Sequence, residues 1–136
     1  MTVTYVTATV KTPRMQVAAD VIASRTPAAA TGTATAGQLV IGTAALAGAT
    51  GVLATIALAA TAFTVAGAVL TLQGVPLSAV ASATGTAALA EFRNNAGTTV
   101  ISGLTVGTSG SDINLNSTSI TSGQTVTITS GTITHG

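Results

Sequence analysis

From residue 38 onward, the pattern of hydrophobic and polar positions is that of short β-strands. The clearest run has one polar face, formed by Thr125, Thr127 and Thr129, and one apolar face, formed by Val126 and Ile128. The pattern predicts strands at residues 38–43, 52–58, 63–72, 84–93, 98–106, 111–115 and 124–134. Short strands rich in Val, Ile, Leu and Thr and separated by glycine-containing turns are typical of sandwiches and barrels.

Turn-forming residues separate these strands. Asn94-Asn95-Ala96-Gly97 is the clearest turn, because Asn and Gly tolerate positive φ angles, and Ser122-Gly123 marks a second one. After Ser130-Gly131 the alternation changes parity, so that Ile133 falls on the face that the threonines occupied. A β-bulge near this point would return the apolar side chains to the core.

The N-terminal residues show a different alternation. Val3, Tyr5 and Thr7 fall on one face of residues 2–10, and Val6 falls on the other. This period of two predicts an N-terminal strand or extended arm over residues 1–12. An exposed arm of this kind could add a strand to the sheet of a neighbouring molecule, so these four residues are the candidate interaction residues.

One short helix is predicted over residues 13–24. Thr12 is suited to cap it, and Pro13 is suited to its first position. Apolar side chains then recur at helical spacing at Met15, Ala18, Ala19 and Ile22. A helix of this length is marginal alone, so it must pack on the β domain.

Residues 26–37 (TPAAATGTATAG) form a low-complexity segment that predicts a loop. At 136 residues the chain is long enough for one domain. We therefore expect a single all-β domain, with an antiparallel β-sandwich or jelly-roll-like barrel over residues 38–136 and one short N-terminal helix.

The charge content of the chain gives information about the surface of the protein. Only 5% of the residues are charged, whereas about 25% is usual. No charged residue lies between Arg25 and Glu91, and the chain carries 28 threonines. A small soluble protein normally keeps itself dispersed with charge. Two compatible interpretations remain open: a threonine-coated surface in water, or a surface that partners largely cover.

Composition also argues against several partners. The net charge is +1 and the four Lys and Arg residues are scattered, so no nucleic-acid partner is expected. Residues 39–72 are uncharged, but glycines and threonines interrupt them and no basic or aromatic flank follows, so we expect no membrane span. The N-terminus lacks a basic region followed by an apolar run, which predicts a cytoplasmic product rather than a secreted one.

Residues that carry chemistry are few. His135 is the single histidine and adjoins the C-terminus, where a catalytic group would be poorly held. Glu91 and Arg93 lie two apart on one predicted strand, and a solvated ion pair is expected there. In residues 112–116, Asp112 and two asparagines occupy alternate positions. Polar residues alternating along a strand are the favoured interpretation, and a calcium site is the less favoured one. The chain has no cysteine, so a thiol nucleophile and a thiolate metal site are excluded. Taken together, these observations predict no enzyme activity, no catalytic residue, no metal, no cofactor and no small-molecule substrate.

Several stretches of this sequence are similar to those of a known protein family. They are residues 5–15, VLATI at 52–56, VLTL at 69–72 with Gly74 and Pro76, SGLTVGTSG at 102–110, Asp112-Ile113, GQTVTI at 123–128 and TITH at 132–135. Together they resemble a family of small structural proteins that tailed bacteriophages and prophages encode in their virion gene clusters. The resemblance implies a virion protein that resembles decoration proteins, and it brings no catalytic residue.

Three functions follow as hypotheses. The first is a capsid decoration (cement) protein of the virion, assembled in the host cytoplasm, which binds the major capsid protein and copies of itself, with a homotrimer as the expected form. The alternative is a tail, baseplate or fibre component with a host-contact role, although receptor-binding surfaces usually offer aromatics and this chain has few. A bacterial adhesin or pilin-like subunit ranks last, because it predicts a secretion signal.

Overall fold

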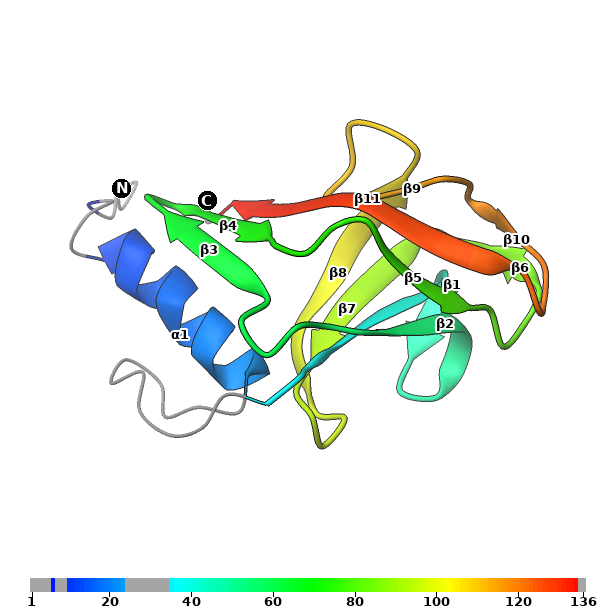
Figure 1. Ribbon diagram of the computed structural model, residues 1–136, viewed down its shortest axis with the longest axis horizontal. Helices are drawn as coiled ribbons and strands as arrows, with labels where there is room; N and C mark the ends of the chain where they lie inside the picture. Colours follow the sequence, from blue (N-terminus) through cyan, green and yellow to red (C-terminus); the bar gives the residue numbers. More distant parts are fainter. Residues whose placement is uncertain (1–5, 7–9, 24–34, 135–136) are drawn as a thin grey trace, which may run out of the picture.

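The computed structural model describes residue 6, residues 10–23 and residues 35–134 (Figure 1). Within these residues the helix α1 (Thr12–Ile22) precedes eleven strands. The strands are β1 (Gln38–Ala47), β2 (Thr50–Ala57), β3 (Phe63–Ala66), β4 (Val69–Leu72), β5 (Leu77–Val80), β6 (Gly85–Thr86), β7 (Leu89–Arg93), β8 (Thr99–Gly107), β9 (Ile113–Leu115), β10 (Ser119–Ile120) and β11 (Thr125–Thr134). The expected all-β fold with one short helix is confirmed.

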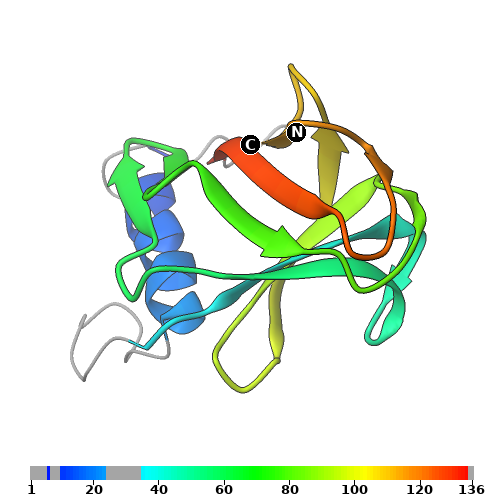
Figure 2. The same cartoon turned by 45° about the vertical axis from the view of Figure 1, so that its right-hand side comes forward.

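Nine strands form one curved sheet in the order β2-β1-β7-β8-β9-β11-β4-β3, and β5 also pairs with β11. Neighbours run antiparallel except β8 and β9, which are parallel. Ser82 donates its backbone N–H to the carbonyl oxygen of Leu53 at 2.8 Å, which joins the end of β5 to β2. The sheet thereby folds into two facing layers, with β11, β4 and β5 lying across β7 and β8 (Figures 1 and 2). Strands β6 and β10 form a small separate sheet.

The hydrophobic core fills the space between the two layers. Its largest fully buried side chain is Phe92 of β7, which meets the ring of Phe63 edge to face at a centroid distance of 4.9 Å. The other large side chains that are almost completely enclosed include Leu39, Ile41, Leu53, Ile56, Ile113, Leu115 and Ile128. The chain therefore has a continuous aliphatic core, despite the many alanines in its sequence.

Helix α1 packs across the side of the sheet between β8 and the β3–β4 hairpin, since it contacts all three strands. Met15 and Ile22 are buried, as their helical spacing predicts. Thr12 does not cap the helix, which is a correction to the sequence-based expectation. The N-cap is Lys11, which makes no side-chain capping bond, and Thr12 instead donates its hydroxyl to the carbonyl oxygen of Gly67 at 2.7 Å.

The helical conformation begins before α1. Val10 donates its backbone N–H to the carbonyl oxygen of Val6 at 2.9 Å, which is the bond of a helical turn. The expected N-terminal strand is therefore wrong at Val10. The rest of that segment, apart from Val6, lies outside the described residues, as do Ser24 at the expected helix end and most of the predicted loop at residues 26–37.

The turns and the bulge match their sequence signals. Gly97 has a φ of +88° and donates its N–H to the carbonyl oxygen of Asn94 at 3.0 Å. In β11, Ile128 pairs with Leu115 and Ser130 pairs with Asn114, so that Thr129 is the extra residue of a bulge. The buried positions of β11 accordingly shift from even to odd residue numbers.

Two strand predictions were wrong in detail, and two strands were missed. Residues 63–72 form the hairpin β3–β4 rather than one strand, because the chain reverses at Gly67, whose φ is +59°. Residues 84–93 divide into β6 and β7, and strands β5 and β10 were not predicted.

Candidate functional site

The four candidate interaction residues belong to the N-terminal segment. Val3, Tyr5 and Thr7 lie outside the described residues. Val6 is described and its side chain is 62% exposed, which is unusual for a valine. Their role in contacting a partner stays a prediction.

A row of threonines crosses the outer face of the sheet. Thr64 of β3 lies opposite Thr71 of β4, and Thr71 lies opposite Thr132 of β11. Two further pairs extend the same face along β11 towards β5, because Ser78 lies opposite Thr127 and Val80 lies opposite Thr125. We call the outer side chains of β3, β4, β5 and β11 the threonine face; they are Thr64, Ala66, Val69, Thr71, Ser78, Val80, Thr125, Thr127, Thr132 and Thr134.

The threonine face is exposed and carries no charge. Thr64 and Thr132 are exposed, Thr71 is half-buried between them, and Val80 is 65% exposed. None of the four strands that form the face contains Lys, Arg, Asp or Glu. A face of hydroxyl and methyl groups loses little on contact with a partner, because no charge must be stripped of its water.

The ion pair between Glu91 and Arg93 forms, but it is not solvated as expected. The side chains of Glu91 and Arg93 are 7% and 14% exposed. Glu91 also accepts a hydrogen bond from the hydroxyl of Thr99 at 3.2 Å, and Arg93 donates to the carbonyl oxygen of Gly48. Gly48 belongs to the turn between β1 and β2, so the pair ties this turn to β7 and serves a structural purpose.

Replacing Arg93 by glutamine is expected to lower the free energy of unfolding by about 3 kcal/mol, because the variant leaves Glu91 buried without a cation. Urea unfolding followed by circular dichroism measures the change. The double variant Glu91→Gln, Arg93→Gln should lose less, since two amides need no counter-charge. A loss below about 0.5 kcal/mol in the single variant, typical of an exposed pair, would contradict the buried arrangement.

The polar residues at 112–116 hold the loop between β8 and β9. The Asp112 carboxylate accepts hydrogen bonds at 3.0 Å from the backbone N–H and the hydroxyl of Thr105. The side-chain oxygens of Asn114 and Asn116 accept backbone N–H groups of Ser111 and Thr127. These oxygens therefore bond to the protein's own chain, and no group of three or more His, Cys, Asp or Glu side chains that could hold a metal ion occurs among the described residues.

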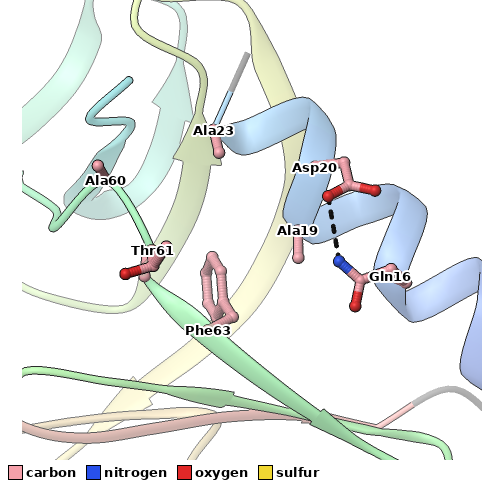
Figure 3. A pocket seen from close by; sticks show the side chains of 8 residues that line it. Gln16, Ala19, Asp20, Ala23, Ala60, Thr61 and Phe63 are labelled. Atoms are coloured by element: carbon pink, nitrogen blue, oxygen red, sulfur yellow. Dashed lines mark hydrogen bonds between the residues drawn. The ribbon is translucent and has the colours of Figure 1, made fainter. Parts of the chain in front are cut away.

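A pocket of about 50 Å³ lies between α1 and the connection that leads into β3 (Figure 3). It is lined by Gln16, Ala19, Asp20, Ala23, Ala60, Thr61, Ala62 and Phe63. Asp20 is only 2% exposed, and its Oδ1 accepts a hydrogen bond from Nε2 of Gln16 at 3.0 Å. Sequence reasoning missed this pocket, because only the packing of α1 on the hairpin places residues of both elements around it.

Within residues 10–23 and 35–134, no helix is long and apolar enough to cross a membrane. His135, the one histidine, lies outside the described residues. Comparison of the chain with protein-family models, with curated proteins and with solved structures found no match.

Proposed function

We propose that this chain is a structural protein of a tailed-bacteriophage virion, and that it decorates the capsid. The observation that carries the proposal is the threonine face, a solvent-facing part of the sheet without a single charged residue. A decoration protein acts by adding buried contacts across the joints between capsid subunits. Uncharged, β-branched side chains on a sheet supply such contacts at a low desolvation cost.

The partners in this proposal are the major capsid protein and further copies of the chain, with a homotrimer as the expected assembly. Closed symmetric oligomers of this kind are the common form of self-association. The N-terminal residues Val3, Tyr5, Val6 and Thr7 reach a neighbouring subunit or the capsid, and the threonine face packs on the adjoining surface. The same features would serve a tail, baseplate or fibre component, which the experiments below distinguish by its position on the particle.

Removing the protein from purified virions is expected to lower the temperature at which the heads rupture, because the contacts across the capsid joints are lost. Release of packaged DNA, followed with a DNA-binding dye during heating, measures this temperature. Adding the purified protein back should restore it, and adding protein unfolded beforehand should not. Stripped heads that rupture at the temperature of intact heads would contradict a cementing role.

A further inference from the structure

Helix α1 covers two strand edges that lack a strand partner among the described residues. Strand β3 is the last strand of the sheet, and β8 pairs with β9 only at Val106 and Gly107. Helix α1 contacts β3, β4 and β8, and it lies alongside β3 in both views of the molecule (Figures 1 and 2). Unpaired strand edges are ready to pair with other chains. Each copy of the protein therefore needs a helix in this position, whichever chain supplies it.

The contacts that hold α1 on the sheet are uneven. Met15 and Ile22 are buried, and Ile22 fits against Gly37 so closely that a Cβ there would meet its Cγ2 at 2.6 Å. The rest of the fit is poorer. The N-cap makes no side-chain bond, a pocket of about 50 Å³ separates the helix from the connection into β3, and Oδ2 of Asp20 is buried without a hydrogen-bond partner. These features reduce the free energy that docking of α1 provides.

The connection between α1 and β1 is longer than the docked arrangement requires. Thr35 donates its backbone N–H to the carbonyl oxygen of Ala23 at 2.9 Å, so the two ends of the connection lie side by side. The eleven residues 24–34 separate them in the sequence. Fully extended, the stretch from Ala23 to Thr35 spans about 40 Å, more than the roughly 30 Å diameter of a small domain. The chain is therefore long enough for α1 to reach the same position on an adjacent copy.

The exposed residue Val6 is joined to α1 by a helical turn. Its carbonyl oxygen accepts the backbone N–H groups of Val10 and Lys11 at 2.9 and 3.3 Å. Its side chain is 62% exposed, so its own subunit covers little of it. The proposed function places this end of the chain on a neighbouring subunit. If the hydrogen bonds at Val6 persist, α1 must move with it.

Exchange of α1 between neighbouring copies accounts for these observations together. An exchanged helix docks on β3, β4 and β8 of another copy with the contacts that it makes in its own chain, so no new complementary surface is needed. We propose that α1 is exchanged between copies of this protein in its assembled form. The inference rests on the proposed self-association and names the element that links one subunit to the next.

Co-expression of two single-cysteine variants tests the exchange. One copy carries Ala19→Cys in α1 and the other carries Thr61→Cys before β3, two positions that line the same pocket (Figure 3). The natural chain has no cysteine, so a short bismaleimide reagent can join positions 19 and 61 only between chains. We expect at least tenfold more covalent dimer than either variant gives alone, with the 19–61 linkage identified by mass spectrometry of the peptides.

A position control measures random collision between chains. Ser122→Cys lies in the turn between β10 and β11, at the opposite end of the molecule from α1 (Figure 1). Co-expressed with Ala19→Cys, it should give only the dimer yield of the single variants. A second pair, Ala23→Cys with Ala60→Cys, lines the same pocket and replaces the first pair if that pair disturbs the packing.

Sedimentation velocity of the same samples separates this inference from the proposed self-association. An oligomer in which neither pair gives the linkage between chains would overturn the exchange and leave self-association standing. A monomer without the linkage would contradict both. An oligomer with the linkage at least tenfold above the control is the result that exchange of α1 predicts.

Discussion

Replacing Phe92 by alanine is expected to lower the free energy of unfolding by about 3–5 kcal/mol, the largest effect of any single truncation in the core. Phe92 of β7 is fully buried, and its ring is the edge-to-face partner of Phe63. The variant loses both the transfer energy of the ring and the contacts around the cavity that remains. Denaturant unfolding, followed by far-ultraviolet circular dichroism, measures the loss.

A matched control is Val80→Ala, which truncates a side chain that is 65% exposed. In the dissociated subunit this change should cost less than about 0.5 kcal/mol, as most exposed substitutions do. Phe92→Leu should fall between the two, because it keeps much of the buried volume. Equal midpoints for Phe92→Ala and Val80→Ala would show that the core is not built around this ring.

Placing a glutamate on the threonine face is expected to disrupt assembly while the fold persists. Thr132→Glu puts a charge beside Thr71 at the centre of the face, where Thr132 is exposed and has room for the longer side chain. Burying that charge against a partner costs several kcal/mol, so the proposed oligomer should form only at higher protein concentrations in the variant than in the wild type. Sedimentation velocity measures the oligomeric state, and circular dichroism checks the fold.

The control places the same charge on an exposed strand position away from the face. Ser102→Glu lies in β8, which is not part of the threonine face, and should leave assembly intact. Deleting Met1–Tyr5 tests the second proposed contact, and this cut spares Val6, whose carbonyl oxygen accepts the first helical bond. The deletion should weaken assembly without changing the β spectrum. Full assembly of Thr132→Glu would exclude the threonine face as the contact surface.

The sequence was sufficient for the fold class and for the positions where local chemistry decides the conformation. The turn at Asn94–Gly97 could be predicted because Asn and Gly accept positive φ angles there. The bulge in β11 could be predicted because the burial pattern must stay in register with the core. In both cases a few neighbouring residues are enough to predict the local conformation.

Features that depend on distant contacts could not be predicted. Thr is a residue type that often caps helices, but the helical turn starts before Thr12. The hydroxyl of Thr12 instead bonds to Gly67, 55 residues away. The burial of Glu91 and Arg93 depends on the β1–β2 turn at Gly48, 45 residues before Arg93. The pocket at Asp20 likewise needs α1 to pack on β3. Hydrophobic periodicity contains none of this information.

We propose that this chain is a component of the phage head. Immunogold labelling of intact virions with antibodies against the purified protein tests it most directly. We expect gold particles over the heads, spread over the capsid surface, and none on particles from which the protein has been stripped. Labelling confined to tails, or no labelling of intact virions at all, would contradict it.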